Sequence, residues 1–418
     1  MDCSLAVRQA GDMHSTHGET AALPRTAPRE ASSATLRIVV SAPRPAQGGG
    51  VAAFWQTVLD SLPCQVAVVE IGRKTSGEKW PAKATRGFAD LVRLLRETKR
   101  SRSELVVLNP SLDPKSLVRD GLSLLALTLR RRRVFVFVRG WDSAVALRIS
   151  RRWRRLFVLV YGRAVCVAVL ASSFQAELRS WGLRVPMAVV TTAALSPPET
   201  RGEARSRGAK SACLQLLFMA RLIPDKGLDA LLRACAILEA EGLAVTLVVA
   251  GDGPERASAQ LLTKELGLTS VTFAGNVAGA QKRELLAASD VFVLPSKREG
   301  MPNAVLEAFS YSLAVVATPI GGLADFLKDD VDCLLLGSVT PLEIAEKLRR
   351  LVNDPGLCRR LGETACAEAS RFFLPDVVGA RMGRLFALAA RKASAQDYFW
   401  FDEPVSVRAG DAVDLSEV

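Results

Sequence analysis

The stretch that decides the fold is VFVL at 291–294, followed by PSKREGMPNAVLEAF at 295–309. The short run of β-branched and aromatic residues predicts a buried strand, and the apolar spacing beyond Asn303 predicts a helix. In doubly wound sheets, ligands bind beyond the carboxyl ends of the strands. The turn between this strand and this helix is therefore where we first expect chemistry.

The same alternation of apolar runs and amphipathic segments extends along most of the chain. It predicts an α/β fold with two Rossmann-like, doubly wound parallel sheets. The predicted strands of the first half are 36–40, 66–71, 105–108, 134–138 and 165–170, with helices at 88–99 and 114–130 between them. Those of the second half are 214–219, 245–250, 271–274, 291–294 and 315–317.

Composition shifts predict the limits of the domains. We expect a disordered leader at 1–35, a first Rossmann-like domain at 36–200, a linker at 201–210 and a second Rossmann-like domain at 211–375, then a helix at 376–396 and an acidic tail at 397–418.

Overall composition excludes several classes of function. The 418 residues contain only two histidines, His14 and His17, and eight scattered cysteines, so a zinc site or a catalytic triad with histidine is not expected. The cysteines are interpreted as reduced thiols of a cytosolic protein. The formal net charge of +12 favours an anionic partner: nucleic acid, acidic lipid or a phosphate-bearing small molecule.

Two carboxylates and a glycine stand out in the deciding stretch. Glu299 lies in the predicted turn and Glu307 in the helix, where they could meet sugar and ribose hydroxyls, and Gly300 would let a ligand approach the backbone. Free backbone amides in the segment Gly300 to Asn303, which includes Met301 and Pro302, could receive phosphate oxygens. A capped helix with a surface charge at Glu307 is the alternative.

Two cations follow the strand predicted at 214–219. Arg221 and Lys226 lie in a loop that enters a helix, so they could hold a diphosphate from two sides. A solvated loop with surface charges is an equally good interpretation of these two residues alone.

These residues carry a family resemblance. ARLIPDKG (220–227), VTLVVAGDGPE (245–255), VTFAGNV (271–277), PSKREGMPNAVLEAF (295–309) and ATPIGG (317–322) resemble, in order, the donor domain of glycosyltransferase family 4. The resemblance implies the GT-B architecture, with two domains facing a central cleft, and sugar transfer with retention of configuration. It also implies that Arg221 and Lys226 hold the diphosphate, Glu299 contacts the transferred sugar and Glu307 binds the ribose.

The first half resembles the acceptor domain of this family more loosely. Gly49 and Gly50 belong to a glycine-rich loop that would face the donor phosphate, with a flexible turn as the alternative. Arg139 stands where relatives often have histidine, which predicts an acidic or phosphorylated acceptor group. Glycines of the family are replaced by Ala220, Ser312 and Cys333, and a proline by Ala314.

Two further motifs are set aside. GDGPER at 251–256 resembles a dinucleotide fingerprint, but Arg256 replaces its third glycine. Asp330-Val331-Asp332 matches a metal-binding D-x-D pattern, but it follows a predicted helix and is better explained as a surface turn. No metal and no cofactor are expected.

The stretch 130–155 contains ten arginines and one acid, Asp142. Trp153, Leu156, Phe157 and Val160 are spaced as an apolar stripe beside them, which predicts a helix that lies on an anionic membrane. A basic face packed on its own core is the alternative. Nucleic acid is not expected, because no RNA-binding motif accompanies the charge.

The sequence thus predicts a retaining, metal-independent hexosyltransferase that uses a UDP- or GDP-type sugar donor. It would work in the cytoplasm, peripherally on the inner membrane face, on a glycan or lipid-linked acceptor of polysaccharide biosynthesis. An epimerase or hydrolase of the same architecture, and a membrane- or nucleic-acid-binding protein without catalysis, are the alternatives.

Overall fold

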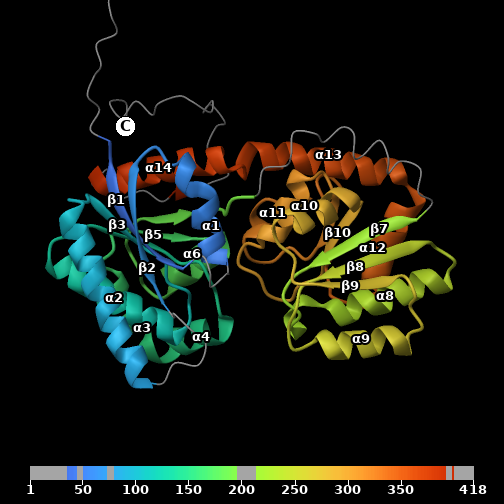
Figure 1. Cartoon of the computed structure of the whole chain (residues 1–418), viewed down its shortest axis with the longest axis horizontal. Coiled ribbons are helices and arrows are strands. Elements are labelled where there is room, and N and C mark those ends of the chain that lie inside the picture. The colour runs from blue at the N-terminus through green and yellow to red at the C-terminus, as the bar shows by residue number, and fades with distance from the viewer. Residues whose placement is uncertain (1–34, 45–49, 73–79, 195–212, 392–397, 400–418) are drawn as a thin grey trace, which may run out of the picture. The chain divides into compact units, whose positions relative to one another are not determined.

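The computed structural model describes residues 35–44, 50–72, 80–194, 213–391 and 398–399 (Figure 1). The leader predicted at 1–35, apart from its last residue, the linker at 201–210, Gly49 and most of the predicted tail lie outside these residues. The described strands form two parallel sheets with helices around them, which confirms the predicted fold class.

The first sheet has seven parallel strands in the order β13-β6-β5-β4-β3-β1-β2. Its strands are β1 (Arg37–Pro43), β2 (Gln65–Ile71), β3 (Leu105–Leu108), β4 (Val134–Phe137), β5 (Cys166–Val169), β6 (Met187–Val189) and β13 (Tyr398–Phe399). The central strands are buried along their whole length, as expected for a sheet covered on both faces.

Helices of the first half cover this sheet. They are α1 (Gly50–Val58), α2 (Trp80–Arg100), α3 (Pro114–Leu129), α4 (Ser143–Arg148), α5 (Arg154–Tyr161) and α6 (Ser172–Ser180), with a 3-10 turn η2 (Leu59–Ser61) and a π-helical turn η3 (Ile149–Trp153). Asp113 and Asp142 cap α3 and α4 by accepting bonds from backbone amides of the first turn. Leu94, Leu124 and Phe157 place α2, α3 and α5 in one hydrophobic core on one face of the sheet.

The second sheet has six parallel strands in the order β12-β11-β10-β7-β8-β9. Its strands are β7 (Leu214–Met219), β8 (Val245–Ala250), β9 (Val271–Gly275), β10 (Val291–Leu294), β11 (Ala314–Ala317) and β12 (Leu334–Leu335). Its helices are α8 (Leu228–Ala240), α9 (Arg256–Glu265), α10 (Gly279–Ala288), α11 (Asn303–Ser310), α12 (Pro341–Asn353) and α13 (Pro355–Phe372), with 3-10 turns η4 (Pro224–Lys226) and η5 (Gly321–Asp325).

The last helix, α14 (Pro375–Arg391), returns to the first sheet. Its Phe386 ring lies edge-on to Phe135, with 5.2 Å between the ring centroids, and stacks 6.5 Å from Trp55. Beyond α14 the structure differs from the predicted tail at two residues. Tyr398 and Phe399 pair with Ala188 and Val189 as strand β13, because these apolar residues extend the sheet.

Among the residues that the structure describes, no helix combines the length and the apolar character needed to cross a membrane.

Candidate donor site

Three neighbouring strands of the second sheet end at the candidate site. The strands β11, β10 and β7 are neighbours in the sheet. The chain runs from β7 to β8 on one side of β7, and later returns to form β10 on the other side of β7. This is a topological switch point, where loops part and leave room for a ligand. The loops after these strands carry most of the site residues predicted for the second half.

Close backbone contacts fix the loop after β7. A Cβ atom on Gly251 would lie 1.9 Å from the Ala220 carbonyl oxygen, and one on Gly253 would lie 2.3 Å from that of Leu222. Both glycines also have positive φ angles. The glycines of the GDGPER motif therefore support the loop that carries Arg221.

The loops after β7 and β10 also press against each other. Gly227, with a φ of 71°, would place a Cβ atom 2.2 Å from the carbonyl oxygen of Pro295, so only glycine fits there. The Lys297 amide donates to the carbonyl oxygen of Asp225 at 2.7 Å. The positions of the two loops are thus fixed by contacts between their backbones and do not depend on side-chain contacts alone.

Lys226 and Glu299 meet across this junction. The Lys226 Nζ atom lies 2.5 Å from Glu299 Oε1, and the Ser296 hydroxyl donates to the same oxygen at 2.9 Å. Both charged side chains are largely buried, with 16% and 11% exposed. The predicted diphosphate cation and sugar-contacting carboxylate are therefore neighbours, and Ser296 is a third member that sequence reasoning missed.

Arg221, in contrast, is exposed and has no ion pair with any residue of the described chain. It remains on the same loop as Lys226, which agrees with the predicted placement. Its guanidinium can therefore bind an anion, because no carboxylate of the described residues occupies it.

Glu307 is buried in α11, with 5% of the residue exposed. The alternative of a charged surface residue is therefore wrong. Lys282 of α10 donates to Glu307 Oε1 at 2.6 Å. Burial raises the pKa of Glu307, and the charge and hydrogen bond of Lys282 oppose this rise. The sequence did not indicate Lys282, because its contact with Glu307, 25 residues away, depends on how α10 and α11 pack.

Two glycines of the loop after β11 pack against the backbone of the turn from Gly300 to Asn303. A Cβ atom on Gly321 would lie 2.3 Å from the Gly300 carbonyl oxygen, and the Gly322 amide donates to that oxygen at 2.6 Å. Met301 and Pro302 are buried. The amides of Gly300 and Met301 donate to no acceptor among the described residues, as the predicted phosphate contact requires.

Arg139 follows β4 and is buried, with 9% of the residue exposed. Its guanidinium carbon lies 4.1 Å from the centre of the Phe54 ring and 4.6 Å from that of Phe137. Nη2 donates to the Gly50 carbonyl oxygen at 3.3 Å and to the Thr192 hydroxyl at 3.2 Å.

No carboxylate of the described residues neutralises Arg139, and its buried Nε and Nη1 atoms lack hydrogen-bond partners. Burial therefore lowers the pKa of the Arg139 guanidinium. A Cβ atom on Gly300 would lie 3.8 Å from the Arg139 carbonyl oxygen, so this residue borders the loop after β10.

Of the substituted family glycines, Ser312 has a positive φ of 54°, whereas Ala220 and Cys333 do not have positive φ angles. A side chain in this left-handed region costs about 1 kcal/mol.

Both carboxylates of the D-x-D pattern have partners within the protein. Asp330 pairs with Arg350, and Asp332 accepts a hydrogen bond from the Lys328 amide.

The exposed apolar stripe predicted at Trp153, Leu156, Phe157 and Val160 is confirmed for the first two residues and wrong for the last two. Phe157 is buried and Val160 is half-buried, whereas Leu159 is 62% exposed. The π-helical turn η3 shifts the helical phase before α5 begins, which a regular helix pattern could not anticipate.

Comparison with known proteins finds relatives of the second half and structural neighbours of most of the chain. Residues 202–367 match the family model described as glycosyl transferases group 1, which confirms the predicted resemblance at the level of this group. The sequence is 28% identical over 166 residues to an alpha-D-kanosaminyltransferase of Streptomyces kanamyceticus. It is 32% identical over 187 residues to a D-inositol 3-phosphate glycosyltransferase of Streptomyces bingchenggensis and 29% identical over 205 residues to the lipopolysaccharide core biosynthesis glycosyltransferase LpsD of Rhizobium meliloti.

These matches cover 40 to 48% of this chain and 41 to 57% of the relatives' length. Solved structures extend the likeness to most of the chain. Anabaena HepE in complex with UDP-glucose has a TM-score of 0.64 at 18% identity, covering 84% of this chain and 99% of that protein. A sucrose-phosphate synthase of Thermosynechococcus elongatus has a TM-score of 0.65 at 18% identity, covering 84% of this chain and 98% of that chain. The fold is thus GT-B, and residues 202–367 are similar to glycosyl transferases group 1.

Proposed function

We propose that the protein is a retaining glycosyltransferase of family 4 that moves a hexose from a UDP- or GDP-type donor to an acceptor. The observation that carries this proposal is the cluster of Lys226, Glu299 and Ser296 where β7 and β10 end at the switch point. HepE, a structural neighbour, binds UDP-glucose. This chain keeps a cation and a carboxylate where a diphosphate and a sugar would meet.

In this proposal Lys226 and Arg221 stabilise the negative charge that develops on the leaving diphosphate. Lys226 is held in place by Glu299 before the donor arrives, whereas exposed Arg221 approaches the diphosphate from solvent. Glu299 would accept hydrogen bonds from hydroxyls of the transferred sugar, and Glu307 from the ribose. The departing phosphate would take the acceptor proton on the same face of the sugar, so no separate base and no metal are needed.

The acceptor is proposed to carry an acidic or phosphorylated group that reaches Arg139. A buried guanidinium without a carboxylate is costly unless an anion supplies the missing charge. A lipid-linked or polysaccharide intermediate would meet this need, and a relative of this chain, LpsD, is named for lipopolysaccharide core biosynthesis.

We also propose that the protein works in the cytoplasm, on the inner face of the membrane. Leu147, Trp153, Leu156 and Leu159 are at least half exposed on α4, η3 and α5. Exposed arginines flank them at positions 148, 151, 152, 154 and 155. Apolar side chains beside unpaired cations suit an anionic lipid surface. Replacing Trp153 and Leu156 by serine should weaken binding to anionic vesicles without changing donor turnover.

The direct test measures release of nucleoside diphosphate from each common sugar nucleotide, with and without a bacterial envelope extract as the source of acceptor. The proposal predicts release that requires the extract and a product with retained anomeric configuration. Turnover without any acceptor would favour the epimerase or hydrolase. No turnover, together with salt-sensitive binding to vesicles or nucleic acid, would favour the binding protein.

A further inference from the structure

We propose that a pocket between the carboxyl-terminal ends of α2 and α3 binds a phosphate group carried by an apolar chain. The pocket has a volume of about 470 Å³. Its apolar lining comes from Val92 and Leu95 of α2 and Leu127 of α3. A ligand here would have an apolar wall on one side and a ring of cations on the other.

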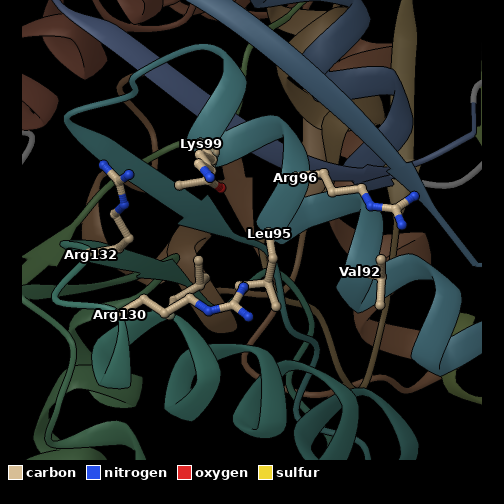
Figure 2. Close-up of a pocket in the computed structure, with 8 residues that line it drawn as sticks. Val92, Leu95, Arg96, Lys99, Arg130 and Arg132 are labelled. Atoms are coloured by element: carbon tan, nitrogen blue, oxygen red, sulfur yellow. The ribbon is translucent and has the colours of Figure 1, made fainter.

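Four cations line this pocket: Arg96, Lys99, Arg130 and Arg132. Figure 2 shows Lys99 extending from α2, Arg130 from the end of α3, and Arg132 from the segment before β4. The side chain of Arg96 extends away from the other three (Figure 2). Lys99, Arg130 and Arg132 therefore form the core of the site, and Arg96 lies at its rim.

The charge of this pocket is not neutralised by the described chain. No carboxylate lines it, and none of its four cations forms an ion pair with a described residue. Among the described residues, the Arg132 side chain donates only to the Ser103 carbonyl oxygen, at 3.4 Å. Cations often lie at carboxyl-terminal helix ends, because each such end carries roughly half a negative charge. The two helix ends balance about one of the three core cations, so most of their positive charge is left for a ligand.

A neighbouring pocket on the other side of α2 shows the contrasting case. Its cations are Arg93, Arg100 and Arg96, which borders both pockets, and Glu70 and Glu97 line it with them. Arg93 pairs with Asp90, and Arg100 lies 3.9 Å from Glu97. Where α2 presents arginines for structural reasons, acids accompany them. The pocket beside α3 lacks such acids, which points to an external anion.

The position of the pocket separates it from the donor site. α2 leads into β3 and α3 leads into β4, so the pocket lies at the amino edge of the first sheet. The site residues predicted in both halves follow the carboxyl ends of strands. The inference therefore stands whether or not the proposed function is right.

The surface beside the pocket favours a lipid as the source of the phosphate. Leu129, directly before Arg130, is 81% exposed, and Val92 and Leu95 of the pocket lining are half-buried. A phosphate headgroup among the cations would leave its acyl chains against these apolar side chains. A soluble phosphate compound would share the headgroup chemistry but would not use them.

The test compares binding of the full chain to phosphatidylcholine vesicles that contain either phosphatidic acid or phosphatidylserine, at matched surface charge. The variant Lys99→Gln/Arg130→Gln removes two exposed pocket cations. Its control, Lys264→Gln/Arg359→Gln, removes two exposed cations of the second half that have no ion pair with a described residue. Far-ultraviolet circular dichroism verifies that both variants are folded.

We expect the parent to prefer phosphatidic acid, and we expect the pocket variant to lose about tenfold in affinity for it while the control does not. Inorganic pyrophosphate, tested in the Lys226→Ala background to disable the donor site, should compete. Pyrophosphate binding that is lost in the pocket variant, without vesicle binding, would support the same site with a soluble ligand. Equal losses in both double variants, or no preference for phosphatidic acid together with pyrophosphate binding that the pocket variant retains, would overturn the proposal.

Discussion

The two halves of the molecule hold their site cations in different ways. In the second half, Lys226 is paired with Glu299, so its charge is balanced and its side chain is fixed. In the first half, Arg139 is buried between two aromatic rings with no carboxylate. The comparison teaches that one cation is preorganised by the protein, whereas the other depends on a ligand for its counter-charge.

Removal of the paired cation should have the largest effect on activity. Lys226→Ala is expected to lower turnover by about 100- to 1,000-fold, because a preorganised charge on the leaving group is lost. Release of nucleoside diphosphate measures this. Lys297→Ala is the control, since this exposed lysine of the neighbouring loop contributes its backbone amide to the junction. Equal turnover in the parent and in Lys226→Ala would remove Lys226 from the proposed mechanism.

Removal of the unpaired cation should affect the acceptor and spare the fold. Arg139→Met is expected to lower kcat/KM for the acceptor by about tenfold or more, since charge-assisted bonds to an anion are lost. Its Tm should be equal to or higher than that of the parent, because an unpaired buried charge is replaced by an apolar chain. Steady-state kinetics and thermal unfolding test this together. A marked drop in Tm with unchanged kinetics would show that Arg139 is structural.

The loop junction that aligns Lys226 can be broken without touching its charge. Gly227→Ala should destabilise the fold by roughly 3 kcal/mol or more, because its φ is positive and a backbone oxygen occupies the Cβ position. Gly242→Ala, also at positive φ but with nothing near its Cβ, should lose only about 1 kcal/mol. Denaturant unfolding measures both. Similar losses in the two variants would mean that the junction is not tightly fixed.

The smallest effect is expected at Ser312. Ser312→Gly should stabilise the protein by about 1 kcal/mol or less, because glycine relieves the left-handed backbone at the end of α11. Ser312→Ala keeps the Cβ atom and should give no such gain. Thermal unfolding of both variants checks this. A gain in the alanine variant alone would place the strain elsewhere.

Local patterns were enough to predict most of the fold. The strands 105–108, 214–219, 245–250 and 291–294 begin and end where the structure places them, because each is a buried apolar run between clear turns. Strands β6 and β12 were missed, since runs of three and two residues carry too little pattern. The phase of α5 was wrong because the π-helical turn before it has no sequence signal that we could read.

For the candidate site, the sequence predicted which motif residues belong to it but not which other residues they contact. Glu299, Glu307 and Lys226 were singled out from their places after strands, and in the structure each of them has an electrostatic partner. Ser296 and Lys282 were missed because contacts depend on how loops and helices pack across the sheet. The isolation of Arg139 is likewise a property of packing, since sequence shows which acids exist but not which of them are near.

The most direct test of the donor site is a thermal-shift measurement of the full chain with UDP, GDP and ADP, alongside Glu307→Gln. We predict that one nucleotide raises the Tm selectively and that the rise is lost in the variant, which keeps the shape of the buried side chain but removes its charge. A rise of equal size in the variant would remove Glu307 from the nucleotide site. No rise with any nucleotide would contradict the central claim that the second half binds a sugar nucleotide.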